Sequence, residues 1–174
     1  MTEQQAYTVI DKRADFEVRE YPAAVVAQVE VLSSFDSAGT KAFRSLVSFI
    51  GGANSSGEKI AMTSPVIQEP TGDESVQAVS FVMPNGSAAE SMPSPSNPKV
   101  KVTQVPAQWA VARGYSGRWT HNSYRRHLSE LARAATDAGF TVNGSPRYAR
   151  YDPPWTPWFL RRNEVILPVE PLPE

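Results

Sequence analysis

Cysteine is absent from this 174-residue chain, and only two histidines, His121 and His127, are present. The first absence excludes disulfides, thiolate nucleophiles, iron–sulfur ligation and zinc–thiolate sites. The second excludes a metal site built from several histidines. Any iron must therefore arrive inside a cofactor or be held by oxygen ligands.

Long runs of one residue type are missing as well. The 17 basic and 18 acidic residues are spread along the chain, and without a dense basic run we expect no nucleic-acid partner. No apolar stretch approaches the roughly 20 residues that span a bilayer. The first residues also lack the basic start and apolar stretch of a signal peptide. We therefore expect a cytoplasmic protein without membrane insertion, built as one domain over residues 1–174 and monomeric.

Periodicity indicates a duplicated arrangement. The segment Pro22-Ala23-Ala24-Val25-Val26-Ala27 recurs loosely as Pro106-Ala107-Gln108-Trp109-Ala110-Val111-Ala112. This predicts β-β-α-β-β halves at about residues 7–84 and 99–170. Alternating residues predict strands within 16–31, 100–105, 109–115 and 165–169, and helical spacing predicts helices over 36–50 and 122–138. The expected fold class is α+β, with two helices against a curved, barrel-like antiparallel sheet.

The helices end at glycines and are linked by a polar loop. Gly51-Gly52 and Gly139 are the expected stops. The loop over residues 85–98 is rich in Pro and Ser, so we expect it to be mobile. The apolar stripe of the first helix is predicted to contain Phe35, Ala38, Ala42, Phe43, Leu46 and Ile50.

The segment Tyr151-Asp152-Pro153-Pro154-Trp155-Thr156-Pro157-Trp158 is unusual for a connecting loop. Three prolines fix the backbone φ, and two tryptophans place a large aromatic surface where Gly, Ser and Asn are normally found. We expect apolar groups to cover these rings.

With Arg161-Arg162-Asn163-Glu164 after it, this segment resembles the Tyr-Asp-Pro-Pro turn and Arg-Arg-Asn-Glu strand of the SOUL haem-binding family. Other segments resemble the family in the same order. They are Phe16 to Pro22, Phe43 to Asn54, Lys59 to Val66 and Phe81 to Pro84. The resemblance covers about residues 7–169 and implies the duplicated α+β fold, which the family shares remotely with bacterial effector-binding domains that hold small apolar molecules.

The resemblance also implies a haem or tetrapyrrole site between the first helix and the Pro/Trp loop. Arg44 is expected at its rim, where a guanidinium would bind a propionate. The apolar walls implied by the resemblance are Phe43, Val47, Tyr151, Trp155 and Trp158.

Each of these residues also has a purely structural interpretation. Phe43 and Val47 stand at core spacing, and an isolated helix arginine such as Arg44 is usually solvated. An Arg–Glu pair at a strand start, as in Arg161 to Glu164, is more often structural than catalytic. The loop tryptophans favour binding more, because they are harder to explain as core.

The chain departs from the family at two positions. Some members that ligate haem place a histidine where Glu20 stands, and some carry a lysine where Thr156 stands. Haem is then expected to bind through apolar and propionate contacts. His127 and His121 are weak candidates for an axial ligand, and surface or half-buried positions are the simpler interpretation of both.

Two other functions stay open. A carrier or sensor of another planar apolar molecule needs the aromatic residues and no iron ligand. A hydrolase would need Glu20, Asp152 or Glu164 as a general base with a pKa raised by burial. Such a carboxylate would face an open pocket, whereas a structural one would pair with Arg161 or Arg162. The leading interpretation is a binding protein for haem or another tetrapyrrole acting as carrier, buffer or sensor, with no catalytic residues assigned.

Overall fold

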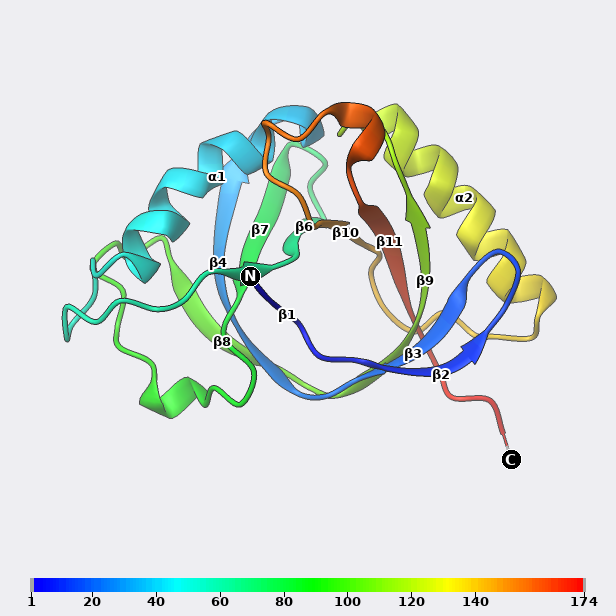
Figure 1. The fold of residues 1–174 in the computed structure, drawn as a ribbon, viewed down its shortest axis with the longest axis horizontal. Helices are drawn as coiled ribbons and strands as arrows, with labels where there is room; N and C mark the ends of the chain where they lie inside the picture. The colour runs from blue at the N-terminus through cyan, green and yellow to red at the C-terminus, as the bar shows by residue number, and fades with distance from the viewer. Residues whose placement is uncertain (1, 174) are drawn as a thin grey trace. The chain divides into compact units, whose positions relative to one another are not determined.

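The computed structural model describes residues 2–173. Their contacts form two compact units. Unit 1 consists of Ala23–Pro106 with the first residues up to Gln5, and unit 2 of Ala6–Pro22 with the chain from Ala107 onward. Each unit contains one long helix packed on antiparallel strands (Figure 1). The predicted α+β class with two helices is confirmed.

Unit 1 has a four-stranded sheet in the order β6-β7-β4-β8. The central pair, β4 and β7, is buried along most of its length, and α1 lies on this pair (Figure 1). A short parallel pair, β1 and β5, completes the unit. The elements are β1 (Glu3–Gln4), β4 (Ala24–Leu32), α1 (Phe35–Ile50), β5 (Thr63–Ser64), β6 (Val66–Pro70), β7 (Val76–Val82), η1 (Ala89–Ser91) and β8 (Lys101–Val105).

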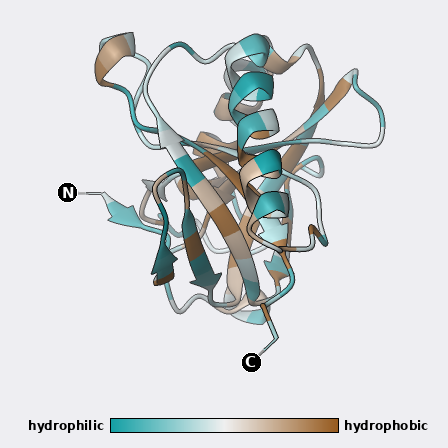
Figure 2. Cartoon of the chain, turned by 90° about the vertical axis from the view of Figure 1, so that its right-hand side faces the viewer, coloured by the Kyte–Doolittle hydropathy of each residue, from teal (hydrophilic) through white to brown (hydrophobic). Residues whose placement is uncertain are grey.

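Unit 2 has a five-stranded sheet in the order β2-β3-β9-β11-β10, and α2 lies on β9 and β11. The outer side of α2 is hydrophilic (Figure 2), whereas Tyr124, Leu131 and Ala135 are buried against the strands. The elements are β2 (Thr8–Lys12), β3 (Glu17–Tyr21), β9 (Gln108–Tyr115), α2 (His121–Asp137), β10 (Arg147–Arg150), η2 (Trp158–Leu160) and β11 (Asn163–Val169).

Both helices begin and end close to the predicted positions. Asp36 lies in the first turn of α1, where a negative charge favours the helix dipole. Gly52, with φ 118°, follows α1, and Gly139, with φ 89°, follows α2. A residue with a Cβ is strained in this left-handed region, so glycine ends each helix at low cost.

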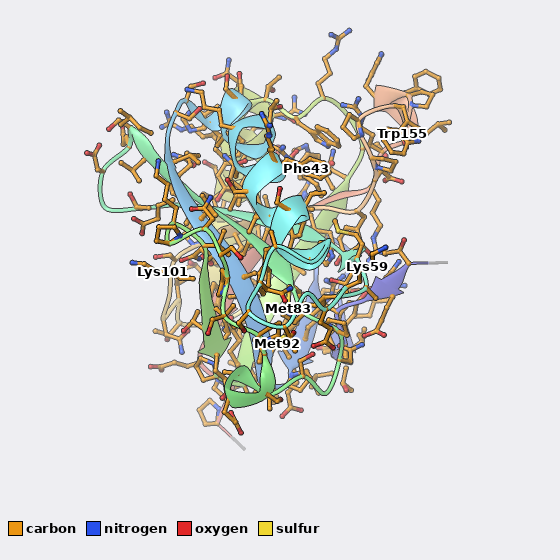
Figure 3. All side chains as sticks on the ribbon, turned by 90° about the vertical axis from the view of Figure 1, so that its left-hand side faces the viewer. Phe43, Lys59, Met83, Met92, Lys101 and Trp155 are labelled. Atoms are coloured by element: carbon orange, nitrogen blue, oxygen red, sulfur yellow. The ribbon has the colours of Figure 1, made fainter. Side chains whose placement is uncertain are left out.

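The Pro/Ser-rich segment over residues 85–98 is held more firmly than we expected. Ser55 donates its backbone N–H to the Ser94 carbonyl at 2.8 Å, and Ser96 donates to Ala53 at 3.0 Å. Met92 packs against the core of unit 1, near the buried Met83 (Figure 3). The expectation of a mobile loop overlooked this apolar packing and the backbone bonds to the turn after α1.

Candidate functional site

Two apolar side chains stand exposed on one side of α1. Phe43 and Val47 are four residues apart, so they neighbour each other on the helix surface. Phe43 is 49% exposed and meets the buried Phe81 edge to face, with ring centroids 5.8 Å apart. The prediction that Phe43 belongs to the buried stripe is wrong, because Phe49 occupies that place. A surface helix normally turns such residues inward, so their exposure favours a binding role.

Arg44 follows Phe43 on α1 and adds a positive charge to this stretch of the helix. Its side chain is exposed. No residue in the described part of the chain forms a hydrogen bond or ion pair with it. The guanidinium therefore keeps all of its donors available for an anionic group of a ligand.

The Pro/Trp loop is held by its own polar contacts. Asp152 accepts the backbone N–H of Arg162 at 2.5 Å, and Tyr151 donates its N–H to the Arg162 carbonyl at 3.1 Å. Arg161 reaches back across the loop and donates to the carbonyls of Thr156 at 2.9 Å and Pro154 at 2.8 Å. These bonds and the prolines fix the loop backbone before any ligand arrives.

The tryptophans of this loop are not covered as we expected. Trp155 is 84% exposed, and Trp158 is also exposed. Trp158 meets Phe159 edge to face, with centroids 5.6 Å apart, and the Arg118 guanidinium lies 5.3 Å from its ring. Rigid backbone with uncovered indoles is typical of a surface that meets another molecule.

Tyr151 is more enclosed than its neighbours on the loop. Its hydroxyl donates to Glu164 at 2.6 Å, and the Arg162 guanidinium stacks 3.8 Å from its ring. Burial and the negative charge of Glu164 raise the pKa of this phenol. Tyr151 therefore joins the exposed loop to a buried polar network inside unit 2.

At the centre of this network is an ion pair that the sequence did not indicate. Arg19 on β3 and Glu164 on β11 are 3% and 2% exposed. They form a bidentate pair with N–O distances of 2.9 and 2.6 Å. The pair spans the strand between them, β9, where Arg19 is registered with Ala110 and Glu164 with Gly114. These small residues leave room for the two long side chains to meet.

The charged groups of Arg19 and Glu164 are paired with several hydrogen-bonding partners. Arg19 also donates to Glu17 at 2.9 Å and to the Tyr21 hydroxyl at 3.0 Å. Burial opposes the charge of Glu164, but the hydrogen bonds and charge of Arg19 and the hydroxyl of Tyr151 hold its pKa below the usual value. Burial likewise opposes the Arg19 cation, yet Glu164 raises the pKa of Arg19. Both groups stay ionised near neutral pH.

None of the three candidate carboxylates has the surroundings that a general base of a hydrolase requires. Glu164 forms ion pairs with Arg19 and Arg162. Its pKa is lowered, whereas a general base requires a raised pKa. Asp152 is engaged by the loop backbone. Glu20 is exposed on β3 beside a hollow of about 190 Å³ that Ala6, Tyr7, Thr8 and Pro22 also line. This hollow is smaller than the roughly 300 Å³ at which ligand pockets begin.

The two histidines lie apart from these residues, on α2. His127 is half-buried and stacks on Tyr115, with centroids 3.8 Å apart. Burial and the nearby charge of Arg126 lower its pKa. His121 is exposed at the first position of the helix. Among the described residues, no group of three or more His, Cys, Asp or Glu side chains is arranged to hold a metal.

The predicted site residues thus fall into two sets. Phe43, Arg44 and Val47 share one stretch of α1 in unit 1. Tyr151, Trp155 and Trp158 share the Pro/Trp loop in unit 2. No helix in residues 2–173 is long and apolar enough to cross a bilayer.

Most of the chain is similar in sequence to known proteins. A family model described as SOUL heme-binding protein matches residues 2–168. Heme-binding protein 1 of Mus musculus is 31% identical over 159 residues, which cover 87% of this chain and 83% of the mouse protein.

Solved structures share the fold at much lower identity. The EcmrR C-terminal domain matches with a TM-score of 0.69 at 17% identity, covering 95% of this chain and 99% of that one. A hydrolase from Listeria innocua matches with a TM-score of 0.67 at 12% identity, covering 92% and 94%. Likeness at this level of identity is one of fold alone.

Proposed function

Because the chain belongs to the SOUL heme-binding protein family, we propose that it binds haem or a closely related tetrapyrrole as a carrier, buffer or sensor. The observation that carries the proposal is the exposure of Phe43 and Val47 beside Arg44 on α1. The three side chains offer a ligand apolar contact and an anion partner on one stretch of helix.

We propose that six side chains contact the ligand. Four are aromatic, one is aliphatic and one is a guanidinium, a set that suits a flat macrocycle with a carboxylate at its edge. They are Phe43, Arg44, Val47, Tyr151, Trp155 and Trp158. None of them is an imidazole, and the position that holds a histidine in some relatives holds the exposed Glu20. Binding is therefore expected to rest on the ring and the propionates. Bound haem would supply an iron centre that the protein's own side chains do not provide.

A haemin titration of the purified protein, followed by the Soret band, tests this proposal. The expected result is a saturable one-to-one shift. Arg44→Ala should raise the Kd for haemin by about 3- to 10-fold, because a charge-assisted bond to a propionate is lost. Trp155→Ala should raise this Kd by about tenfold, because an aromatic contact is lost. Both side chains are exposed, so neither change should disturb the fold.

Matched controls separate specific contacts from general surface effects. Arg125→Ala removes another exposed helix arginine, and Leu32→Ala removes an apolar side chain that is 73% exposed on β4. Neither should change the Kd. A Soret shift that does not saturate, or one that Arg125→Ala weakens as much as Arg44→Ala, would contradict the proposal. A panel of iron-free porphyrins and apolar dyes then tells whether another planar molecule is preferred.

A further inference from the structure

The Pro/Trp loop ends in exposed apolar side chains, of which the proposed haem contacts account for only two, Trp155 and Trp158. We define the apolar tip as Trp155, Trp158, Phe159 and Leu160. Phe159 is 59% exposed and Leu160 is 65% exposed, and both lie in η2 beyond the residues proposed to contact haem. Four large apolar side chains within six residues are exposed, and the rings of Trp158 and Phe159 meet edge to face. Apolar side chains gathered on a surface in this way often mark an interaction site.

The tip is presented by a braced backbone. Leu160 donates its N–H to the Pro157 carbonyl at 2.9 Å, and Thr156 donates to Pro153 at 3.1 Å. The Arg161 guanidinium binds two loop carbonyls and stacks 4.1 Å from the Trp119 ring. The exposure of Phe159 and Leu160 is therefore built into the fold of the loop.

Two arginines, Arg118 and Arg161, lie next to the apolar tip. Arg118 is exposed and lies 5.3 Å from the Trp158 ring, and Arg161 lies directly after Leu160. Any surface that receives the tip must also accept positive charge.

We propose that the apolar tip docks onto an anionic lipid bilayer, with Phe159 and Leu160 entering the boundary between headgroups and acyl chains. Trp158 then lies at headgroup depth, where indoles are favoured, and Arg118 meets the lipid phosphates. The charge of the surroundings favours this occupant over an apolar protein groove. Such docking is interfacial and needs no helix that spans the membrane.

Flotation with vesicles, in the absence of haem, tests this proposal. One set contains equal amounts of phosphatidylglycerol and phosphatidylcholine, and the other contains phosphatidylcholine alone. We expect the protein to float with the anionic vesicles and to remain below with the neutral ones. Replacing both apolar residues, Phe159→Ser with Leu160→Ser, should reduce partitioning about tenfold or more. Arg118→Gln should reduce it about fivefold, and added salt should weaken the remainder.

The matched control is Leu32→Ser, an equally exposed leucine on β4 of unit 1, which should float like the wild type. The Phe159→Ser, Leu160→Ser variant should keep the wild-type Kd for haemin, so that loss of docking and loss of haem binding are distinguishable. No flotation with anionic vesicles, or flotation that the tip variant leaves unchanged, overturns the proposal. Concentration-dependent dimerisation that needs the tip, without flotation, overturns it in favour of a protein partner.

Discussion

At the scale of single residues, Arg19 and Glu164 of unit 2 form a buried ion pair in which each charge needs the other. Glu164→Gln leaves the buried guanidinium without its main counter-charge, a change that typically costs about 3 to 5 kcal/mol. Glu17 also binds Arg19, so we expect the lower end of this range. Urea denaturation measures the loss. Glu20→Gln, an exposed change on the same strand, should stay within about 0.5 kcal/mol of the wild type, and similar losses for both variants would contradict the assignment.

The same residue predicts part of the acid sensitivity. The folded-state pKa of Glu164 is depressed relative to the unfolded chain. Its contribution to the free energy of unfolding is therefore fully present above the unfolded-state pKa, and it is lost as the pH falls through the folded-state value. Urea midpoints measured from about pH 7 to about pH 3 should fall less steeply in Glu164→Gln than in the wild type. Parallel profiles would show that other carboxylates dominate.

Tyr151 allows its structural and binding roles to be separated. Tyr151→Phe removes the hydroxyl that donates to Glu164 but keeps the ring. We expect a stability loss of about 1 to 3 kcal/mol, because a buried carboxylate loses a donor. We expect little change in the haemin Kd, because the ring supplies the proposed apolar contact. Thermal unfolding and a Soret titration on one preparation measure both. A large loss of affinity without a loss of stability would show that the hydroxyl itself contacts the ligand.

At the scale of elements, the two helix starts offer a matched comparison. Thr120 caps α2 and accepts the N–H of Ser123 at 3.2 Å, whereas the hydroxyl of Ser34 makes no such bond to the start of α1. Thr120→Ala should therefore cost about 1 kcal/mol, and Ser34→Ala less than about 0.5 kcal/mol. Urea midpoints of the two variants check the difference. Equal losses would mean that the cap hydrogen bond is not the cause.

The elements themselves could be predicted from the sequence because their signals are local. Helical spacing and terminal glycines located α1 and α2, and alternation located β4, β9 and β11. The side facing the core was harder to assign. In α1 a stripe containing Phe43 and one containing Phe49 differ by a small rotation, and only packing on β4 and β7 selects the second.

The buried network could not be predicted in the same way. Arg19 and Glu164 are 145 residues apart, and their meeting depends on the order of three strands. Two signals were nevertheless present. Glu164 opens an uninterrupted apolar strand, where a charge needs a partner. Ala110, Ala112 and Gly114 alternate on β9, where larger side chains would have filled the space above the sheet.

At the scale of the whole molecule, the family resemblance supplied what local signals could not. It grouped residues of α1 with residues of the Pro/Trp loop, more than 100 positions later, as contacts of one ligand. In the structure, the group on α1 consists of exposed apolar side chains next to an arginine. The group on the Pro/Trp loop consists of exposed aromatic side chains on a backbone held by hydrogen bonds. That both groups serve one ligand stays a prediction.

A double-mutant cycle tests whether one ligand joins the two sets. Phe43→Ala and Trp155→Ala should each weaken haemin binding by about 3- to 10-fold. If both rings contact one macrocycle, losing the first lets the ligand shift away from the second, so the combined loss should differ from the sum by at least about 0.5 kcal/mol. Leu32→Ala combined with Trp155→Ala is the control and should be additive. Strict additivity would show that the two rings are not coupled through the ligand. If only one of the two changes weakened one-to-one binding, the ligand would belong to the residues of one unit alone.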